Sequence, residues 1–105
     1  MKIYILRKSL SSLKTPIEIK EYHTHALTVR EFISEMVERN YSARPIDCSL
    51  EECVGLACDD FMDGCCYIID ATQNKRYADL DEELNFCEED EVMLVKLKYV
   101  RGIIW

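Results

Sequence analysis

One segment decides the fold predicted for this chain: residues 27–40, which read Leu27-Thr-Val-Arg-Glu-Phe-Ile-Ser-Glu-Met-Val-Glu-Arg-Asn40. Its apolar residues recur at i, i+3, i+4, i+7 and i+8, a spacing that forms one stripe along a helix. The stripe consists of Val29, Phe32, Ile33, Met36 and Val37. The pattern predicts an amphipathic helix whose apolar face must be buried against another element.

The start of this helix is also marked in the sequence. Thr28 and Glu31 have the spacing of a capping box, in which each side chain accepts a hydrogen bond from the other residue's backbone N–H. Leu27 and Phe32 have the spacing of a hydrophobic staple. We therefore expect the helix to begin after Thr28 and to end near Asn40.

The remaining chain supplies strands for a sheet. Alternating or continuous apolar runs bounded by turn residues predict strands at 1–8, 16–22, 65–70, 75–78 and 92–100. The first run is apolar on both faces, so we expect it at the centre of the sheet, in an antiparallel hairpin with the second. The run 75–78 is short enough for an edge strand.

In the last predicted strand, two sets of side chains alternate. Met93 and Val95, with Leu97 and Tyr99, are the expected core face, because Lys96 and Lys98 mark the other face as exposed to solvent. Between the fourth and last strands, Leu80 and Leu84 have the spacing of a single helical or 3₁₀ turn.

Composition limits the class of protein. The 105 residues are 49% hydrophobic and 31% charged, which is ordinary for one soluble folded domain spanning residues 1–105. There is no apolar run long enough to cross a membrane and no signal-peptide pattern, so we expect a cytoplasmic protein. The net charge is −7, and residues 45–91 carry fifteen acidic and two basic side chains. Such a surface repels phosphate, so no nucleic-acid partner is expected.

The order of these elements resembles that of the ubiquitin-like β-grasp superfamily. Among its bacterial members, the chain resembles the small ubiquitin-like proteins linked to secretion systems. Four segments carry the resemblance: Met1–Ile5 resembles the opening strand, Leu27–Ile33 the helix start, and Tyr77–Leu80 with Glu89–Val95 the closing turn and strand. The resemblance implies an α+β fold with a mixed four- to five-stranded sheet packed on one main helix. It leaves residues 42–64 as a Cys-rich insert between helix and third strand, in which Ser49 and Glu52 could cap a short helix.

The resemblance also implies a function. In ubiquitin-like folds the outer sheet face is a common docking site, so we expect a non-catalytic module that binds a protein partner with an acidic and apolar segment. An apolar C-terminal tail, residues 101–105, could bind a partner or a second copy of the chain. The candidate binding residues are Leu94, Lys96, Lys98, Ile103, Ile104 and Trp105.

A metal or iron–sulfur protein is the alternative from another class. Cys48, Cys53 and Cys58 are five residues apart and Cys87 follows, but the Cys-x2-Cys step of plant-type ferredoxins is missing. The pair His23-x-His25 is a weak metal motif. We therefore expect no cofactor, and cysteines that are reduced and mostly packed in the core.

The sequence argues against two further functions. Conjugation or sulfur transfer after C-terminal processing is an alternative, but those ubiquitin-like proteins end in Gly-Gly, whereas this chain has a lone Gly102 and ends in Ile104-Trp105. An enzyme is not expected. No nucleophile stands beside a base in a known motif, and the acidic neighbours of Cys58 would raise the pKa of its thiol.

Overall fold

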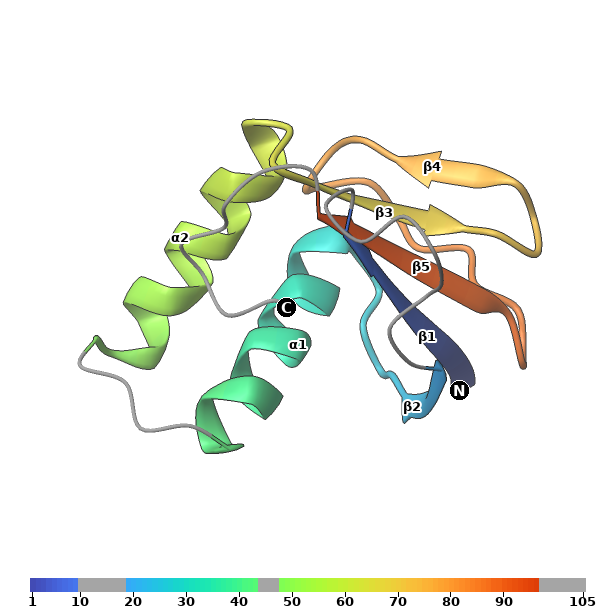
Figure 1. Cartoon of the computed structure of the whole chain (residues 1–105), viewed down its shortest axis with the longest axis horizontal. Coiled ribbons are helices and arrows are strands. Elements are labelled where there is room, and N and C mark those ends of the chain that lie inside the picture. Colours follow the sequence, from blue (N-terminus) through green and yellow to red (C-terminus); the bar gives the residue numbers. More distant parts are fainter. Residues whose placement is uncertain (10–18, 44–47, 97–105) are drawn as a thin grey trace.

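A computed structural model describes residues 1–9, 19–43 and 48–96 of the chain. These residues form an α+β structure with one mixed sheet and two helices (Figure 1). In chain order the elements are β1 (Lys2–Ser9), β2 (Ile19–His23), α1 (Val29–Ala43), α2 (Leu50–Met62), β3 (Cys66–Asp70), β4 (Lys75–Tyr77) and β5 (Glu91–Lys96). The predicted α+β class is confirmed.

The sheet has five strands in the order β2-β1-β5-β3-β4. The strands that come first and last in chain order, β1 and β5, lie side by side inside the sheet and run parallel. All other neighbouring strands are antiparallel. This confirms the predicted β1–β2 hairpin, the central position of β1 and the edge position of β4. Both helices lie on the same side of the sheet (Figure 1), and their buried residues share one core with the strands.

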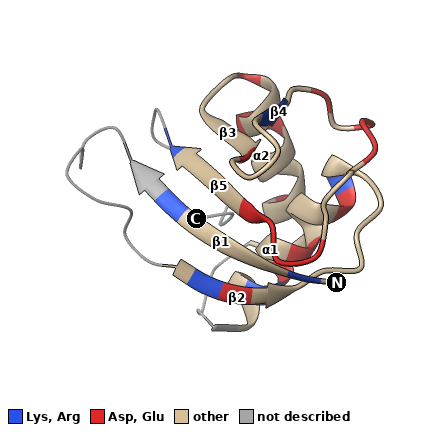
Figure 2. Cartoon of the chain, turned by 90° about the vertical axis from the view of Figure 1, so that its right-hand side faces the viewer, with Lys and Arg blue, Asp and Glu red and all other residues tan. Residues whose placement is uncertain are grey.

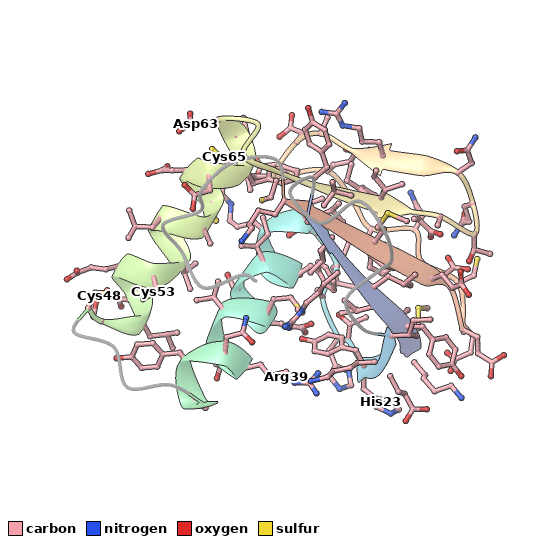
Figure 3. The ribbon with its side chains drawn as sticks, viewed as in Figure 1. His23, Arg39, Cys48, Cys53, Asp63 and Cys65 are labelled. Atoms are coloured by element: carbon pink, nitrogen blue, oxygen red, sulfur yellow. The ribbon has the colours of Figure 1, made fainter. Side chains whose placement is uncertain are left out.

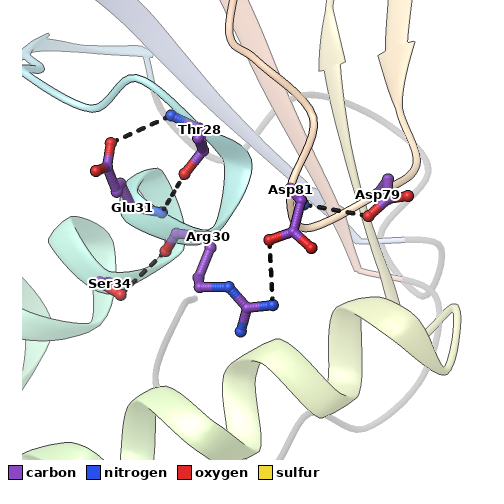
Figure 4. A network of polar contacts seen from close by, with 6 residues as sticks. All are labelled: Thr28, Arg30, Glu31, Ser34, Asp79 and Asp81. Atoms are coloured by element: carbon purple, nitrogen blue, oxygen red, sulfur yellow. Dashed lines mark hydrogen bonds and ion pairs between the residues drawn. The ribbon is translucent and has the colours of Figure 1, made fainter.

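Helix α1 begins as the sequence predicts. The Glu31 backbone N–H donates to Thr28 Oγ1 and the Thr28 N–H donates to Glu31 Oε2, both at 3.3 Å (Figure 4). The five apolar stripe residues are all fully or almost fully buried. The predicted staple is wrong, because Leu27 is 72% exposed and its backbone N–H, not its side chain, contacts Glu31. The helix also runs three residues beyond Asn40, to Ala43.

The loop before β5 completes the start of α1. The backbone N–H groups of Val29 and Arg30 donate to the carbonyls of Glu82 and Leu80, at 3.1 and 2.9 Å. Arg30 also pairs with Asp81 at 3.4 Å (Figure 4). The predicted helical turn at Leu80 is a simple turn followed by an isolated bridge between Thr28 and Glu83. The loop therefore supplies acceptors for N–H groups that a helix end leaves unpaired.

The prediction of one main helix with an insert is wrong, because most of the segment 42–64 is a second core helix. Ser49 Oγ accepts from the Glu52 N–H at 3.2 Å, as predicted, but α2 continues to Met62 rather than stopping near Cys58. The helix buries Cys53, Ala57, Cys58 and Phe61 against the rest of the core. Its apolar face makes it part of the domain's core.

The predicted core face of the last strand is also wrong. In β5 the residues of the core cluster are Val92 and Leu94; of the predicted face, Met93 is only half-buried, and Val95, although buried, lies outside that cluster. The register explains this, since Val92 pairs with Ile5 of β1, whose side chain lies under α1 in the core. The flanking lysines misled the prediction because β5 is apolar on both faces from Val92 to Val95. Leu97 and Tyr99 lie outside the described residues.

Candidate docking surface

The candidate site is the outer face of the sheet, which we define as the face opposite α1 and α2. The strand register aligns one side chain from each strand in a single row across this face. In sheet order the row is Ile19, Leu6, Met93, Ile69 and Arg76. Its first four members are apolar, and we call them the apolar row. The alignment follows from strand pairing, which places directly opposed side chains on one face.

The apolar row is graded in exposure. Ile19, on the edge strand β2, is 62% exposed, Met93 and Ile69 are partly exposed, and Leu6 is nearly buried. Ile19 was predicted to lie in β2 but not to face solvent to this extent. The row therefore offers its most accessible apolar side chain at the β2 edge.

Two aromatic contacts lie beside the apolar row. Val95 pairs with Tyr67 of β3, and the Arg76 guanidinium carbon lies 3.7 Å from the Tyr67 ring centroid. On the other side of the row is Tyr4, with the Lys2 ammonium 5.7 Å from its ring centroid. An aromatic ring under a cation presents both apolar area and charge to an incoming ligand.

The charge along the strands is divided. Acidic residues of the segment 88–91 gather where β5 begins, around Lys2 at the start of β1, while Arg7 and Lys96 lie toward the opposite end of these strands (Figure 2). At the acidic end Lys2 pairs with Glu21 at 3.6 Å and with Glu89 at 3.2 Å. The hydrogen bond that the Lys2 ammonium donates to Glu89 raises the pKa of Lys2. One end of these strands is thus strongly acidic, with Lys2 held among its carboxylates.

The structure moves two of the predicted binding residues, Leu94 and Lys96, off this surface. Leu94 is 3% exposed and belongs to the core, so its predicted place on the outer face is wrong. Lys96 is half-buried and, because it alternates in phase with Leu94, lies on the helix side of the sheet. The other candidates, Lys98, Ile103, Ile104 and Trp105, lie outside the described residues.

Sequence reasoning missed Met93 and Ile69 as partly exposed residues of the outer face, and it missed that the buried Leu6 lies between Ile19 and Met93 in the same row. The available signal was that β1, β3 and β5 are each apolar on both faces, although α1 and α2 can cover only one. An apolar residue left on the second face of several adjacent strands predicts a continuous outer patch.

The side chains considered for metal binding are spread over the structure. Within residues 1–9, 19–43 and 48–96 there is no group of three or more His, Cys, Asp or Glu residues placed to hold a metal ion. His23 and His25 are both exposed at the end of β2 and beyond it. The Sγ atoms of Cys48 and Cys53 are 2.8 Å apart.

Two buried carboxylates form a separate polar cluster where β3 ends and β5 begins. Asp70 and Asp90 are 0% and 2% exposed. The Gln73 side-chain amide donates to Oδ2 of Asp70 at 3.1 Å and to Oδ2 of Asp90 at 2.6 Å. The backbone N–H of Cys87 donates to Asp90 at 2.8 Å. The cluster joins the β3–β4 turn to the loop before β5.

The two carboxyl groups titrate differently. Burial, followed by the hydrogen bond to Asp90, raises the pKa of Asp70 to about 6. Burial also acts to raise the pKa of Asp90, but hydrogen bonds from Asp70, the Cys87 N–H and the Gln73 amide together hold it below its ordinary value. Asp70 is therefore the group that holds a shared proton, as in a carboxylate dyad.

Comparisons with protein-family models, with curated proteins and with solved structures gave no match to this chain. Among the described residues, neither helix has the length and apolar character needed to span a bilayer.

Proposed function

We propose that this chain is a ubiquitin-like β-grasp protein of the bacterial, cytoplasmic type that acts as a non-catalytic interaction module. The five-stranded mixed sheet, with its parallel central pair and helices on one side, is compatible with that fold. In this proposal the partner is a protein, and it docks on the outer face of the sheet.

The apolar row carries the proposal. Four apolar side chains from four adjacent strands line up on a face that neither helix covers. Adjacent strands are about 4.8 Å apart, so the row spans about 14 Å. Nine or ten residues of an α-helix cover about the same length, because the rise is about 1.5 Å per residue. Ile19, Met93 and Ile69 are the accessible members of this row, and apolar side chains aligned in this way are typical of recognition sites for amphipathic segments.

The charges favour one chemistry for the partner. Arg76 ends the row at the β4 side and stacks on Tyr67, so its cation faces the same surface. The segment proposed is an amphipathic helix that lies across the strands, with apolar side chains on the row and an acidic residue near Arg76. The predicted contributions of Lys98 and of the tail, including a homodimer through residues 103–105, stay predictions.

The experiment uses the exposed end of the row. A photo-crosslinking amino acid replaces Ile19 in the full chain in its native cells, and in a second strain it replaces Leu27, which is equally apolar and exposed but lies off the row. We expect a discrete crosslinked protein from position 19 and not from position 27. The partner is then identified, purified and titrated against the protein.

The affinity measurement decides the outcome. Losing a buried Ile contact costs about 1.5–3 kcal/mol of binding free energy. Ile19→Asp should therefore raise the dissociation constant by roughly 10- to 100-fold, while Leu27→Asp should leave it unchanged. Both positions are exposed, so both variants should fold. Equal binding by Ile19→Asp and wild type, or the same crosslink from both positions, would refute docking on the apolar row.

A further inference from the structure

A pair of thiols meets at the start of α2, away from the outer face of the sheet. Cys48 lies directly before the N-cap residue Ser49, and Cys53 lies one turn into the helix. The Cys53 backbone N–H donates to the Ser49 carbonyl at 3.0 Å, which fixes the first turn of the helix. The two Sγ atoms are 2.8 Å apart, and Figure 3 shows both residues at the same end of α2.

The two thiols differ in access. Cys48 is half-exposed, whereas Cys53 is 2% exposed and belongs to the core. The hydrogen bond with Cys48, and then burial, raise the pKa of the Cys53 thiol to about 11. A dissolved oxidant can therefore reach the sulfur of Cys48 first, while Cys53 is placed to react only with Cys48.

We propose that Cys48 and Cys53 form a reversible disulfide, which makes the start of α2 a site of thiol oxidation. The S–S bond is about 2.0 Å long, so the two sulfurs need to approach by roughly 0.8 Å. This proposal is independent of the docking surface, since it concerns the other side of the molecule.

The oxidant proposed is a low-molecular-weight disulfide such as glutathione disulfide. The Cys48 thiolate attacks one sulfur of that disulfide, forming a mixed disulfide and releasing one thiol. The Cys53 thiolate then attacks the Cys48 sulfur, which forms the protein disulfide and releases the second thiol. The two protein thiols are oxidised by two electrons, the small disulfide is reduced to two thiols, and their two protons pass to those thiols.

Oxidation would fix the contact between the two helices. The Tyr41 hydroxyl of α1 donates to the Cys48 carbonyl at 3.0 Å, so Cys48 is already attached to α1. A bond from Cys48 to the buried Cys53 would hold the first turn of α2 in place. Closing such a loop restricts the open state of the segment, so amide hydrogen exchange in this turn should slow by roughly tenfold.

To test this, the full chain is equilibrated without oxygen in a series of buffers that range from reduced glutathione alone to glutathione disulfide alone. A Cys87→Ser background removes an exposed thiol that would form its own adducts. After acid quenching and alkylation, mass spectrometry counts the thiols. Cleavage at Glu51 and Glu52 then separates the two cysteines unless they are bonded. We expect two thiols to be lost together and the two fragments to stay linked until reduced.

Two variants make the order of reaction visible. Cys53→Ala should accumulate one glutathione adduct on Cys48 that is not resolved, whereas Cys48→Ala should leave the buried Cys53 unmodified. Cys48 is half-exposed, so Cys48→Ala tests the pair even if Cys53→Ala disturbs folding. The proposal is overturned if the pair stays reduced in the most oxidising buffer, or if either cysteine is found bonded to a different one.

Discussion

Replacing Asp70 by Asn should change how the stability of this protein depends on pH. In the folded protein Asp70 has a pKa of about 6 instead of its ordinary 3.8, and it hydrogen-bonds Asp90. Because the folded state binds this proton more tightly than the unfolded state, the contribution of Asp70 to stability is fully present below about pH 4 and is lost as the pH rises through about 6. Asp90, with its lowered pKa, contributes stability that is lost only below about pH 4.

The size of the effect follows from the shift. Each pKa unit corresponds to about 1.4 kcal/mol, so a rise of about two units costs about 3 kcal/mol at neutral pH. The favourable shift of Asp90 offsets part of that cost, which leaves a net loss of about 1–3 kcal/mol. Asn keeps the shape of the protonated acid and can donate to Asp90 without acquiring a charge. Its amide nitrogen no longer accepts from the Gln73 side chain, but that amide keeps Asp90 and the Asn85 carbonyl as acceptors. Asp70→Asn should therefore be more stable than wild type at pH 8 by about 1–3 kcal/mol.

Urea unfolding followed by far-UV circular dichroism at pH 4, 5, 6, 7 and 8 measures this difference. The matched control is Asp59→Asn, an exposed carboxylate on α2, which should change the free energy of unfolding little at any pH. The difference between Asp70→Asn and wild type should be near zero at pH 4 and grow up to pH 6. A difference that does not vary with pH, or a variant less stable than wild type at pH 8, would refute a shared proton in this pair.

Other predictions concern the contacts of α1 and of the β4 side of the core. Phe32→Ala, at a fully buried position, should lower the free energy of unfolding by about 3–5 kcal/mol in denaturant titrations, and a loss under 1 kcal/mol would contradict its packing. Thr28→Ala, which removes the acceptor for the Glu31 N–H, should cost about 1 kcal/mol by the same assay, with Thr28→Ser close to wild type. Tyr77→Phe removes the hydroxyl that accepts from the Asn85 N–H at 2.9 Å, so it should cost about 1 kcal/mol and speed exchange of that amide.

The parts of the fold that the sequence predicts well have strong local signals. Helix α1 combines a five-residue apolar stripe with a capping box, and the structure has both. The start of α2 was likewise marked by Ser49 and Glu52. Its end was missed because the apolar residues past Cys58 include only Phe61 and Met62 among three aspartates. One of these acids, Asp60, is nevertheless buried in the structure, which the polar pattern does not indicate.

The candidate surface depends on tertiary register, which local patterns do not contain. A strand that is apolar on both faces fits the core either way round, and the choice for β5 is made by its pairing with β1. Leu94 and Met93 were therefore each assigned to the wrong face of the sheet. The proximity of Cys48 and Cys53 has the same origin in three dimensions. Their five-residue spacing was visible, but only the geometry of the capped first turn brings the sulfurs together.

The parallel pairing of β1 with β5 has a consequence for how the chain folds as it is synthesised. Tyr4 hydrogen-bonds across to Asp90, and Tyr4 and Glu91 are register partners, so the centre of the sheet joins the two ends of the described chain. Until β5 leaves the ribosome, the β1–β2 hairpin and the β3–β4 hairpin have no strand between them. Forming the centre of the sheet requires closure of nearly the whole chain, a non-local step that slows folding. A nascent chain that lacks β5 would expose the unpaired backbone N–H and C=O groups along one edge of β1, so among the described residues a late strand closes a sheet that an early one began.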